Sequence, residues 1–402
     1  MGTDPSEASI ANADGSVPIS SASPLRVLHL FSNCKWTGPA EPALNLCLAL
    51  RRRGVDARFA CAPEAGSSVN KIVETARDRG IEPVLDFRLG KHRNPWNNFL
   101  DRRALRRWLD THAVDLIHCH LDNDHEIALV PARERNIPIV RSSYEGLGFR
   151  NDSRHHRLLR HAALVLEPSE MAREHDLRLS GADPARFAVV PGAIDTERFD
   201  SRRDTPDGRR WLNLPRDAFV IGIVARMQTH RHYEDLFQAI ARMAAEDPLV
   251  HLVIIGRGSK QDKVGFEPVR RLGLEKAVHF TGYIDGENYV GMLKSFDTGV
   301  FLVPGSDGTC RAAREMLAMG RPMVVADRGM LREIVTDKQD GVVFDGTADG
   351  LYGALCRMRG DRALRLELGR NARHTAESRY SLDVQAEAVE KCYRRVVSAV
   401  AG

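Results

Sequence analysis

The chain has 402 residues, 43% of them hydrophobic and 28% charged, and this composition excludes the disordered and fibrous classes of protein. Its length exceeds what one hydrophobic core usually serves, so we expect two domains. The net charge of +4 lacks the basic excess of dedicated nucleic-acid-binding proteins, so we expect no nucleic-acid partner. The seven cysteines show no CxxC spacing that would suggest zinc or a redox pair, which fits a reducing cytoplasm.

Residues 1–24 are rich in Ser, Ala, Pro and Asp, and they carry neither the charged nor the apolar region of a signal peptide. We expect them to form a disordered tail. No run in the sequence approaches the roughly eighteen apolar residues that cross a bilayer. These features predict a protein of the cytoplasm, either free or bound at the inner face of the membrane.

From residue 25 onward, short apolar runs alternate with helical patterns, which is typical of a parallel sheet covered by helices. The first unit is a predicted strand at 25–31, a polar turn at 32–39 and an amphipathic helix at 43–53. Further strands of the first half are predicted at 57–62, 114–119, 137–142, 163–167 and 187–190. Strands of the second half are predicted at 219–225, 249–255, 278–281, 298–303, 322–326 and 341–344.

Between the two series, residues 200–215 are charged and contain Pro and Gly, with little that could enter a core, so they are predicted to be a linker. The stretch 381–399 has apolar residues at helical spacing. The sequence therefore predicts an α/β protein with two doubly wound, Rossmann-like parallel-sheet domains. We expect these domains at 25–199 and 200–380, followed by a C-terminal helix at 381–402.

Ligands of open parallel sheets bind beyond the carboxyl ends of the strands. After the predicted strand at 298–303 comes the sequence PGSDGTC (304–310), followed by a helical pattern from Arg311 to Met319. A helix that starts after a Gly-rich loop favours an anion, because its free amide groups and its dipole point at the ligand. Asp307 in the loop and Glu315 in the helix can both face a ligand that lies along the helix start.

The stretch 303–326 resembles the donor-site motif of glycosyltransferase family 4, which is usually Glu, seven residues and Glu, followed by a Gly-x-Pro-Val-Val strand. Asp307 and Glu315 take the acidic positions here, and GRPMVVA (320–326) takes the strand. Four further segments are similar to that family in chain order: VPGAIDTERF (190–199), IGIVAR (221–226) followed by Arg231, IIGRG (254–258) and FTGY (280–283).

The resemblance implies a GT-B fold, with two domains facing across a cleft and the terminal helix crossing back to the first. The first domain would serve the acceptor and the second a nucleotide-sugar donor, in a retaining hexosyl transfer. Arg226 and Arg231 would clamp the donor diphosphate, which gains negative charge as the glycosidic bond breaks, and we expect both at the rim of the cleft and not in a core. Glu315 would bind the ribose, and Asp307 would hold a sugar hydroxyl. The remaining donor-side residues would be Gly38, Gly256, Gly258, Tyr283, Gly308, Thr309 and Cys310.

The sequence departs from the family pattern at several positions. Asp307 is one methylene shorter than the usual Glu, Cys310 replaces a Gly, and Arg231 replaces a Lys with a planar fork of the same charge. The paired Gly of the first strand-helix turn reads Gly38-Pro39 here, and a Pro has no N–H to offer a diphosphate. These departures put donor choice and full activity in question.

The largest departure is in the first domain, where a His commonly touches the donor sugar and Tyr144 stands here. A phenol can donate a hydrogen bond, but its unperturbed pKa of about 10 prevents it from acting as the same base near neutral pH. Retaining transfer in this family is thought to use the leaving phosphate as base, so loss of the His leaves the reaction feasible. We group Tyr144 with Asp307, Arg226 and Arg231 as catalytic candidates.

On the acceptor side the candidates are His118, His120, Glu145, Lys91 and Arg93. The segment HCHLDNDH (118–125) gathers metal-type ligands at a strand end, and a polar rim, a substrate contact and a metal site are its alternatives. The resemblance implies that no metal or other cofactor is required. The basic stretches 88–107 and 154–160 are solvated helix faces, or they bind an anionic acceptor or an anionic membrane surface.

We expect a hexosyltransferase of EC class 2.4 that acts on a glycan or lipid-linked acceptor, in cell-surface polysaccharide or glycoconjugate synthesis. Two rivals share the donor site. A nucleotide-sugar epimerase of the same fold would need no acceptor, and a degenerate binding protein would hold the donor without turnover.

Overall fold

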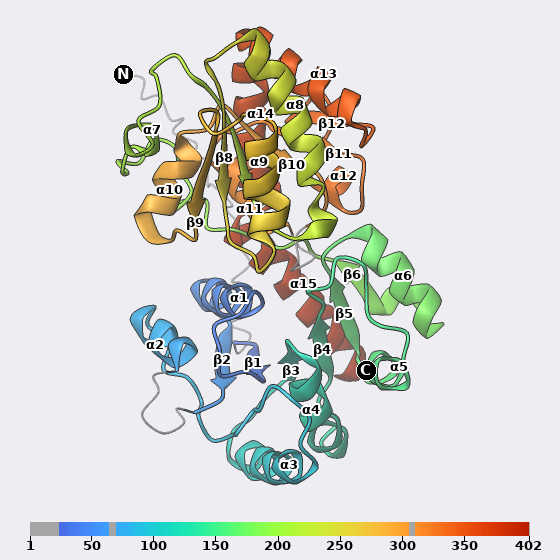
Figure 1. Cartoon of the computed structure of the whole chain (residues 1–402). Helices are drawn as coiled ribbons and strands as arrows, with labels where there is room; N and C mark the ends of the chain where they lie inside the picture. Colours follow the sequence, from blue (N-terminus) through green and yellow to red (C-terminus); the bar gives the residue numbers. More distant parts are fainter. Residues whose placement is uncertain (1–23, 64–69, 305–309, 402) are drawn as a thin grey trace, which may run out of the picture.

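The computed structural model describes residues 24–63, 70–304 and 310–401, and within them two six-stranded parallel sheets lie one above the other (Figure 1). The first sheet has the strand order β2-β1-β3-β4-β5-β6. Its strands are β1 (Arg26–Phe31), β2 (Asp56–Cys61), β3 (Leu116–Cys119), β4 (Ile139–Ser142), β5 (Leu164–Glu167) and β6 (Phe187–Val189).

The second sheet has the order β12-β11-β10-β7-β8-β9. Its strands are β7 (Phe219–Val224), β8 (Val250–Ile255), β9 (Val278–Gly282), β10 (Thr298–Phe301), β11 (Met323–Ala326) and β12 (Gly341–Phe344). The predicted strands are therefore confirmed in both halves, with ends that differ by at most two residues. The fold class, two doubly wound parallel-sheet domains, is confirmed as well.

Helices cover both faces of each sheet. The first half contains α1 (Ala40–Arg52), α2 (Lys71–Asp78), α3 (Pro95–Thr111), α4 (Asp122–Glu134), α5 (Ser153–His161), α6 (Glu170–Ser180) and the 3-10 turn η1 (Pro184–Arg186). The second half contains α7 (Gly208–Trp211), η2 (Thr229–Arg231), α8 (Tyr233–Glu246), η3 (Asp262–Phe266), α9 (Glu267–Arg271), α10 (Gly286–Lys294), α11 (Arg311–Ala318), α12 (Leu331–Ile334), α13 (Ala348–Gly360), α14 (Arg362–Arg379) and α15 (Leu382–Ala401).

Alternate side chains of a strand point to opposite sides of the sheet. Because helices cover both sides, the strands are buried on both faces. In β1, Val27 and Phe31 enter the core beneath α1, whereas Leu28 and Leu30 enter the core beneath α3 and α4. His29 has the same parity as Val27, and it pairs in register with His118 of β3. Both imidazoles therefore point to the face that α1 and α15 cover.

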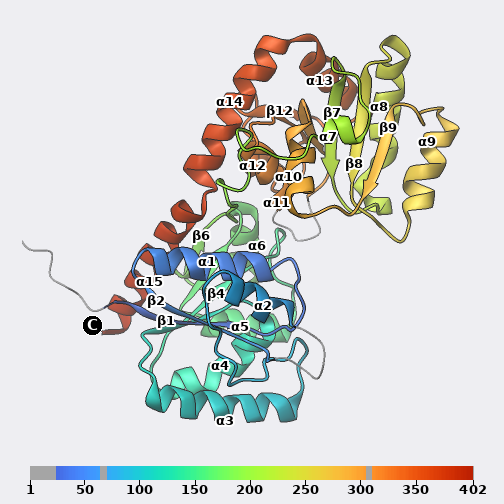
Figure 2. The ribbon, with the colours of Figure 1, turned by 90° about the vertical axis from the view of Figure 1, so that its left-hand side faces the viewer.

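The C-terminal helix joins the two halves. Figure 2 shows α14 and α15 running as an almost continuous rod from the second sheet down to the first. On the first half, Ala386, Val389 and Tyr393 are buried in the same core as α1. In the part of the chain that the structure describes, no helix is both long and apolar enough to span a bilayer.

The segment between the sheets is more structured than its composition indicated. Within residues 200–215, α7 packs against α10, and a Cβ added at Gly208 would lie 2.9 Å from the Cα of Met292. A Gly permits this close approach of two helices, which a composition-based linker prediction does not foresee.

Candidate active site

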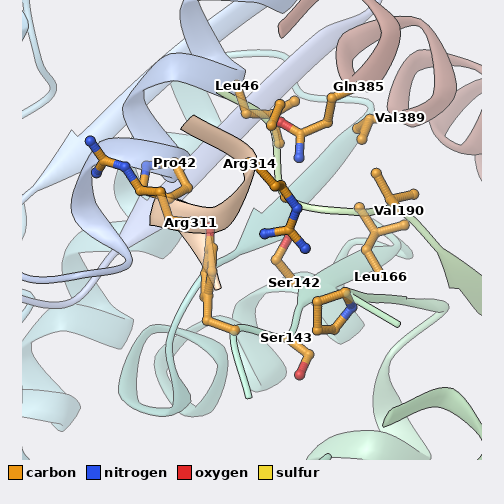
Figure 3. Close-up of a pocket in the computed structure, with 14 residues that line it drawn as sticks. Pro42, Leu46, Ser142, Ser143, Leu166, Val190, Arg311, Arg314, Gln385 and Val389 are labelled. Carbon is orange, nitrogen blue, oxygen red and sulfur yellow. The ribbon is translucent and has the colours of Figure 1, made fainter. Parts of the chain in front are cut away.

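A pocket lies where the two halves meet, and side chains of α1, α11 and α15 line it together with the ends of β4 and β5 (Figure 3). Arg311 and Arg314 of α11 line it, and in Figure 3 Arg314 points toward Ser142 whereas Arg311 points away from it. The pocket residues are Pro42, Leu46, Ser142, Ser143, Tyr144, Leu166, Pro168, Val190, Gly192, Ala193, Arg311, Arg314, Gln385 and Val389. This is the edge of both sheets at which parallel strands end, so the expected location of the site agrees with the geometry.

On the second half, two glycines fix the loop that carries Arg226. Gly256 has a φ of +145°, and a Cβ there would lie 2.2 Å from the carbonyl oxygen of Ala225. A Cβ at Gly258 would lie 2.0 Å from the carbonyl oxygen of Met227. These contacts let the turn after β8 lie against residues 225–227, and Arg226 between them is exposed. The two glycines therefore have a structural role in positioning Arg226.

Arg231 does not lie on the rim, where we expected it. Its side chain is 3% exposed, and its Nη1 donates a hydrogen bond of 2.5 Å to the carbonyl oxygen of Pro304. Arg231 therefore braces the chain just after β10 from inside the second half. A guanidinium has several donors in a fixed fork, so it can brace a carbonyl and still present charge to a neighbouring anion.

The start of α11 shows why the family usually has a Gly at the position of Cys310. Cys310 is the N-cap of α11 and adopts a left-handed backbone with φ 48° and ψ 43°. Glycine adopts this conformation without strain, whereas a side chain makes it unfavourable. The usual Gly therefore suits the backbone of this position. Asp307, Gly308 and Thr309 lie outside the described residues.

Glu315 of α11 is buried, and its carboxylate is already engaged by two donors. It is 3% exposed, and it accepts hydrogen bonds of 2.6 Å from the hydroxyl of Tyr289 and 2.7 Å from Nε of Arg311. Arg311 also donates from Nη1 to Glu41 of α1 at 2.5 Å, so one guanidinium bridges the two halves. Burial raises the pKa of Glu41, but the charges of Arg311, Arg79 and Arg198 outweigh it and lower the pKa overall.

Two further donor-side candidates are solvent-accessible. Tyr283 follows β9 and is 64% exposed, and the guanidinium carbon of Arg257 lies 5.5 Å from the centre of its ring. Gly38 is exposed in the turn before α1, whose N-cap is Pro39. Pro39 has a φ of −70°, close to helical geometry, so it begins the helix at Ala40, earlier than the predicted residue 43.

On the first half, Tyr144 lines the pocket and Glu145 beside it is exposed. The hydroxyl of Tyr144 lies 2.7 Å from Nδ1 of His120. Burial raises the pKa of Tyr144 well above its ordinary value, so the phenol is neutral near pH 7. Lys91 and Arg93 are exposed in the segment before α3.

The acceptor-side candidates His118 and His120 are both fully buried beneath the cleft, so neither imidazole reaches the cleft surface in this structure. Nδ1 of His118 lies 2.5 Å from the hydroxyl of Tyr393, and its Nε2 lies 2.8 Å from Oγ of Ser142. Burial lowers the pKa of both histidines well below the ordinary value, with a smaller contribution from Arg141. Both imidazoles therefore lie behind the cleft surface, where they contact the side chains that form it.

The ligand set that we considered at 118–125 is also different in the structure. The imidazoles that converge are His29, His118 and His120, which offer one ring nitrogen each within 4.8 Å of one another. Such a trio has the donor chemistry for zinc. Both nitrogens of His118 and of His120 already have hydrogen-bond partners, so the arrangement favours a hydrogen-bonded network over a metal centre.

Sequence reasoning missed several residues of the site: Glu41, Tyr289, Arg311, Arg314, His29 and Tyr393. Arg311 and Arg314 could have been found, because Arg311 directly follows the predicted phosphate loop and Arg314 lies about one helical turn further along. His29 and Tyr393 gave no such signal. They reach the site only through strand pairing and through the packing of α15.

Two family models match consecutive parts of the chain. Residues 37–198 match the model described as Glycosyltransferase Family 4, and residues 204–375 match Glycosyl transferases group 1. The D-inositol 3-phosphate glycosyltransferase of Thermomonospora curvata is 32% identical over 52% of this chain and 51% of its own length. The chain thus spans about half the length of the curated relatives it matches.

Solved structures share the arrangement of both sheets. A glycosyltransferase from Rickettsia africae has a TM-score of 0.78 over 94% of this chain and 99% of its own, at 14% identity. HepE of Anabaena, in complex with UDP, has a TM-score of 0.75 over 92% of this chain and 100% of its own, at 18% identity. The fold is that of GT-B enzymes, and the chain belongs to the glycosyltransferases.

Proposed function

We propose that the chain is a retaining hexosyltransferase that moves a sugar from a nucleotide-diphosphate sugar to a glycan or lipid-linked acceptor. The observation that carries the proposal is that Arg311 and Arg314 of the second half line one pocket together with Ser142 and Tyr144 of the first half. A donor held on one wall and an acceptor on the other would bring the reacting atoms together, which transfer requires.

The donor side supplies positive charge for the leaving diphosphate. Arg226 is exposed on a loop fixed by two glycines, and Arg231 braces the chain after β10. Fixed cations and amides stabilise charge that develops in the transition state without reorganising at the moment of reaction. Tyr144 is a neutral phenol at pH 7 and therefore acts as a hydrogen-bond donor, leaving the departing phosphate as the base. The complex of HepE with UDP supports a nucleotide donor.

The acceptor is a hydroxylated molecule that carries an anion. The name of the Thermomonospora relative, which acts on an inositol phosphate, supports an acceptor of this kind. On this chain, exposed Lys91 and Arg93 provide cations on the acceptor half. Cell-surface polysaccharide or glycoconjugate synthesis is the pathway class that we propose for such an acceptor.

The reaction needs no metal ion, because Arg226, Arg231 and the start of α11 supply the positive charge. Turnover by purified protein is therefore expected to survive millimolar EDTA unchanged. Loss of turnover in EDTA, with recovery on adding one divalent ion, would instead assign a metal role to His29, His118 and His120.

A membrane-bound acceptor would be reached through the start of α3. Trp96 is 67% and Phe99 48% exposed, and their rings stack with centroids 5.8 Å apart, near Lys91 and Arg93. Aromatic side chains insert at the membrane interface, and basic side chains are attracted to anionic lipids. Flotation with phosphatidylglycerol vesicles tests this. We expect binding that falls in Trp96→Ala and in high salt, whereas no binding would restrict the acceptor to soluble molecules.

The decisive test of the function is the dependence of nucleotide release on an acceptor. Purified chain is incubated with UDP-glucose, alone and with myo-inositol phosphate or an oligosaccharide, and free UDP is measured. A transferase releases UDP faster with an acceptor. An epimerase converts the sugar nucleotide without releasing UDP, and a degenerate binding protein binds UDP-glucose but leaves it unchanged.

A further inference from the structure

A chain of three side chains runs from the buried interior of the first sheet to the pocket. His29 Nδ1 lies 3.0 Å from Nε2 of His120, and Nδ1 of His120 lies 2.7 Å from the hydroxyl of Tyr144. Both histidines are completely buried, and Tyr144 lines the pocket. At the far end of the chain, Nε2 of His29 has no hydrogen-bond partner among the described residues.

Both imidazoles are neutral in the folded protein. Burial lowers the pKa of His29 to about 3 and the pKa of His120 well below its ordinary value. A neutral imidazole carries one N–H and one bare nitrogen, so each hydrogen bond in the chain fixes the tautomer of the next ring. The hydrogen bonds that join His29, His120 and Tyr144 can therefore all run in either of two directions.

The unpartnered nitrogen at His29 selects one of these directions. If His29 carried its proton on Nε2, a buried N–H would have no acceptor, and orphaned buried N–H groups are rare in proteins. With the proton on Nδ1, His29 donates to Nε2 of His120. His120 must then carry its own proton on Nδ1, and it donates to the oxygen of Tyr144.

We propose that His29 and His120 are positioning residues that make the oxygen of Tyr144 an acceptor, so that its O–H is directed away from His120 and can donate to a ligand in the pocket, which Ser142 also lines. The role in transfer rests on the proposed function, whereas the tautomers do not. In the reverse direction the O–H of Tyr144 would point back at His120 and be lost to the ligand. The ligand group that fits is an oxygen with a lone pair, such as a phosphate or a sugar hydroxyl.

His118 provides an internal control for this argument. Its two nitrogens contact the hydroxyls of Tyr393 and Ser142, and a hydroxyl can either donate or accept. The surroundings of His118 therefore dictate neither tautomer. The fixed direction at His29 and His120 follows from the orphan nitrogen, not from burial alone.

The direct test is the tautomer of each ring in the full chain. Protein labelled with 15N at histidine is measured by long-range 1H–15N correlation, and signals are assigned with His29→Gln and His120→Gln. We expect both residues as Nδ1–H tautomers at pH 7. Nε2–H tautomers at these two positions, or a protonated ring at either, would overturn the proposal.

The functional test compares losses in single and double variants with UDP-glucose as the probe. Tyr144→Phe is expected to lower kcat/KM for UDP release by about tenfold, the loss of one hydrogen bond to a charged group. His29→Phe should cause a similar or smaller loss, and adding it to Tyr144→Phe should cause no further loss. Losses that multiply would overturn the coupling between the two residues.

Failure of the proposed function would look different. The wild-type protein would then release no UDP from UDP-glucose with any acceptor. The tautomer measurement would still decide the direction of the hydrogen bonds from His29 to Tyr144. If His29→Phe failed to fold, the spectrum of the wild-type protein would remain a complete test of the tautomers.

Discussion

The two walls of the cleft are built in different ways. The donor wall consists of chain segments that are short and local: a turn with two glycines, an exposed Arg226 and the start of α11. The acceptor wall depends on contacts between distant parts of the chain, since His29 meets His120 across 91 positions and His118 meets Tyr393 across 275. A ligand site can thus be assembled from a contiguous motif or from strand register, and only the first type is visible in one sequence.

The largest expected effect is on the donor wall. Because Arg226 is exposed and the glycine turn holds its loop, Arg226→Ala should leave the fold intact. It should lower turnover about a hundredfold or more, the usual cost of removing one such stabilising group. Turnover and thermal midpoint are measured together, with exposed Arg216→Ala as the matched control. Full turnover in Arg226→Ala would contradict the assignment of the donor site to this wall.

Arg231 differs from Arg226 because it belongs to the donor wall but is buried. Arg231→Ala should reduce turnover and also lower the free energy of unfolding by about 1–3 kcal/mol, since the carbonyl of Pro304 loses a buried charged donor. Denaturant unfolding of Arg226→Ala and Arg231→Ala side by side checks this. Equal stability of the two variants would mean that the brace contributes nothing.

The sequence predicted the strands, the order of the two halves and the donor motifs, because strand burial and Gly-rich turns leave local patterns. It placed Arg231 on the rim, since a motif specifies a residue type but not its depth. It offered His118 to the acceptor for the same reason. The partners of both residues, Pro304 and Tyr393, lie 73 and 275 positions away. Such contacts depend on the packing of whole elements.

A smaller effect is expected on the acceptor wall at His125 of α4. The side chain is fully buried, and neither ring nitrogen has a hydrogen-bond partner among the described residues. Replacing it by Leu removes two unsatisfied polar atoms, so His125→Leu should raise the free energy of unfolding by about 1 kcal/mol at pH 7. Denaturant titrations check this, with exposed His92→Leu as the control.

The pH dependence of the same variant gives a second measurement. Burial lowers the pKa of His125 well below 6.5, so the unfolded chain binds the proton and the folded protein does not. The wild type should therefore lose stability relative to His125→Leu as pH falls below about 6.5, by about 1.4 kcal/mol per pH unit. Parallel stability curves for the two proteins between pH 7 and 5.5 would contradict a buried, neutral His125.

The smallest expected effect concerns the distance between the walls. Arg311 pairs with Glu41 across the cleft and with Glu315 on its own helix, and Glu315 is the residue expected to bind the ribose of the donor. A nucleotide at Glu315 would therefore act on the contact that joins the halves. We expect the radius of gyration from small-angle scattering to decrease at saturating UDP, because closure excludes water and aligns the reacting groups. Glu41→Gln should enlarge the radius without UDP, whereas the exposed control Glu82→Gln should not. An unchanged radius in all three proteins would argue that the cleft does not close.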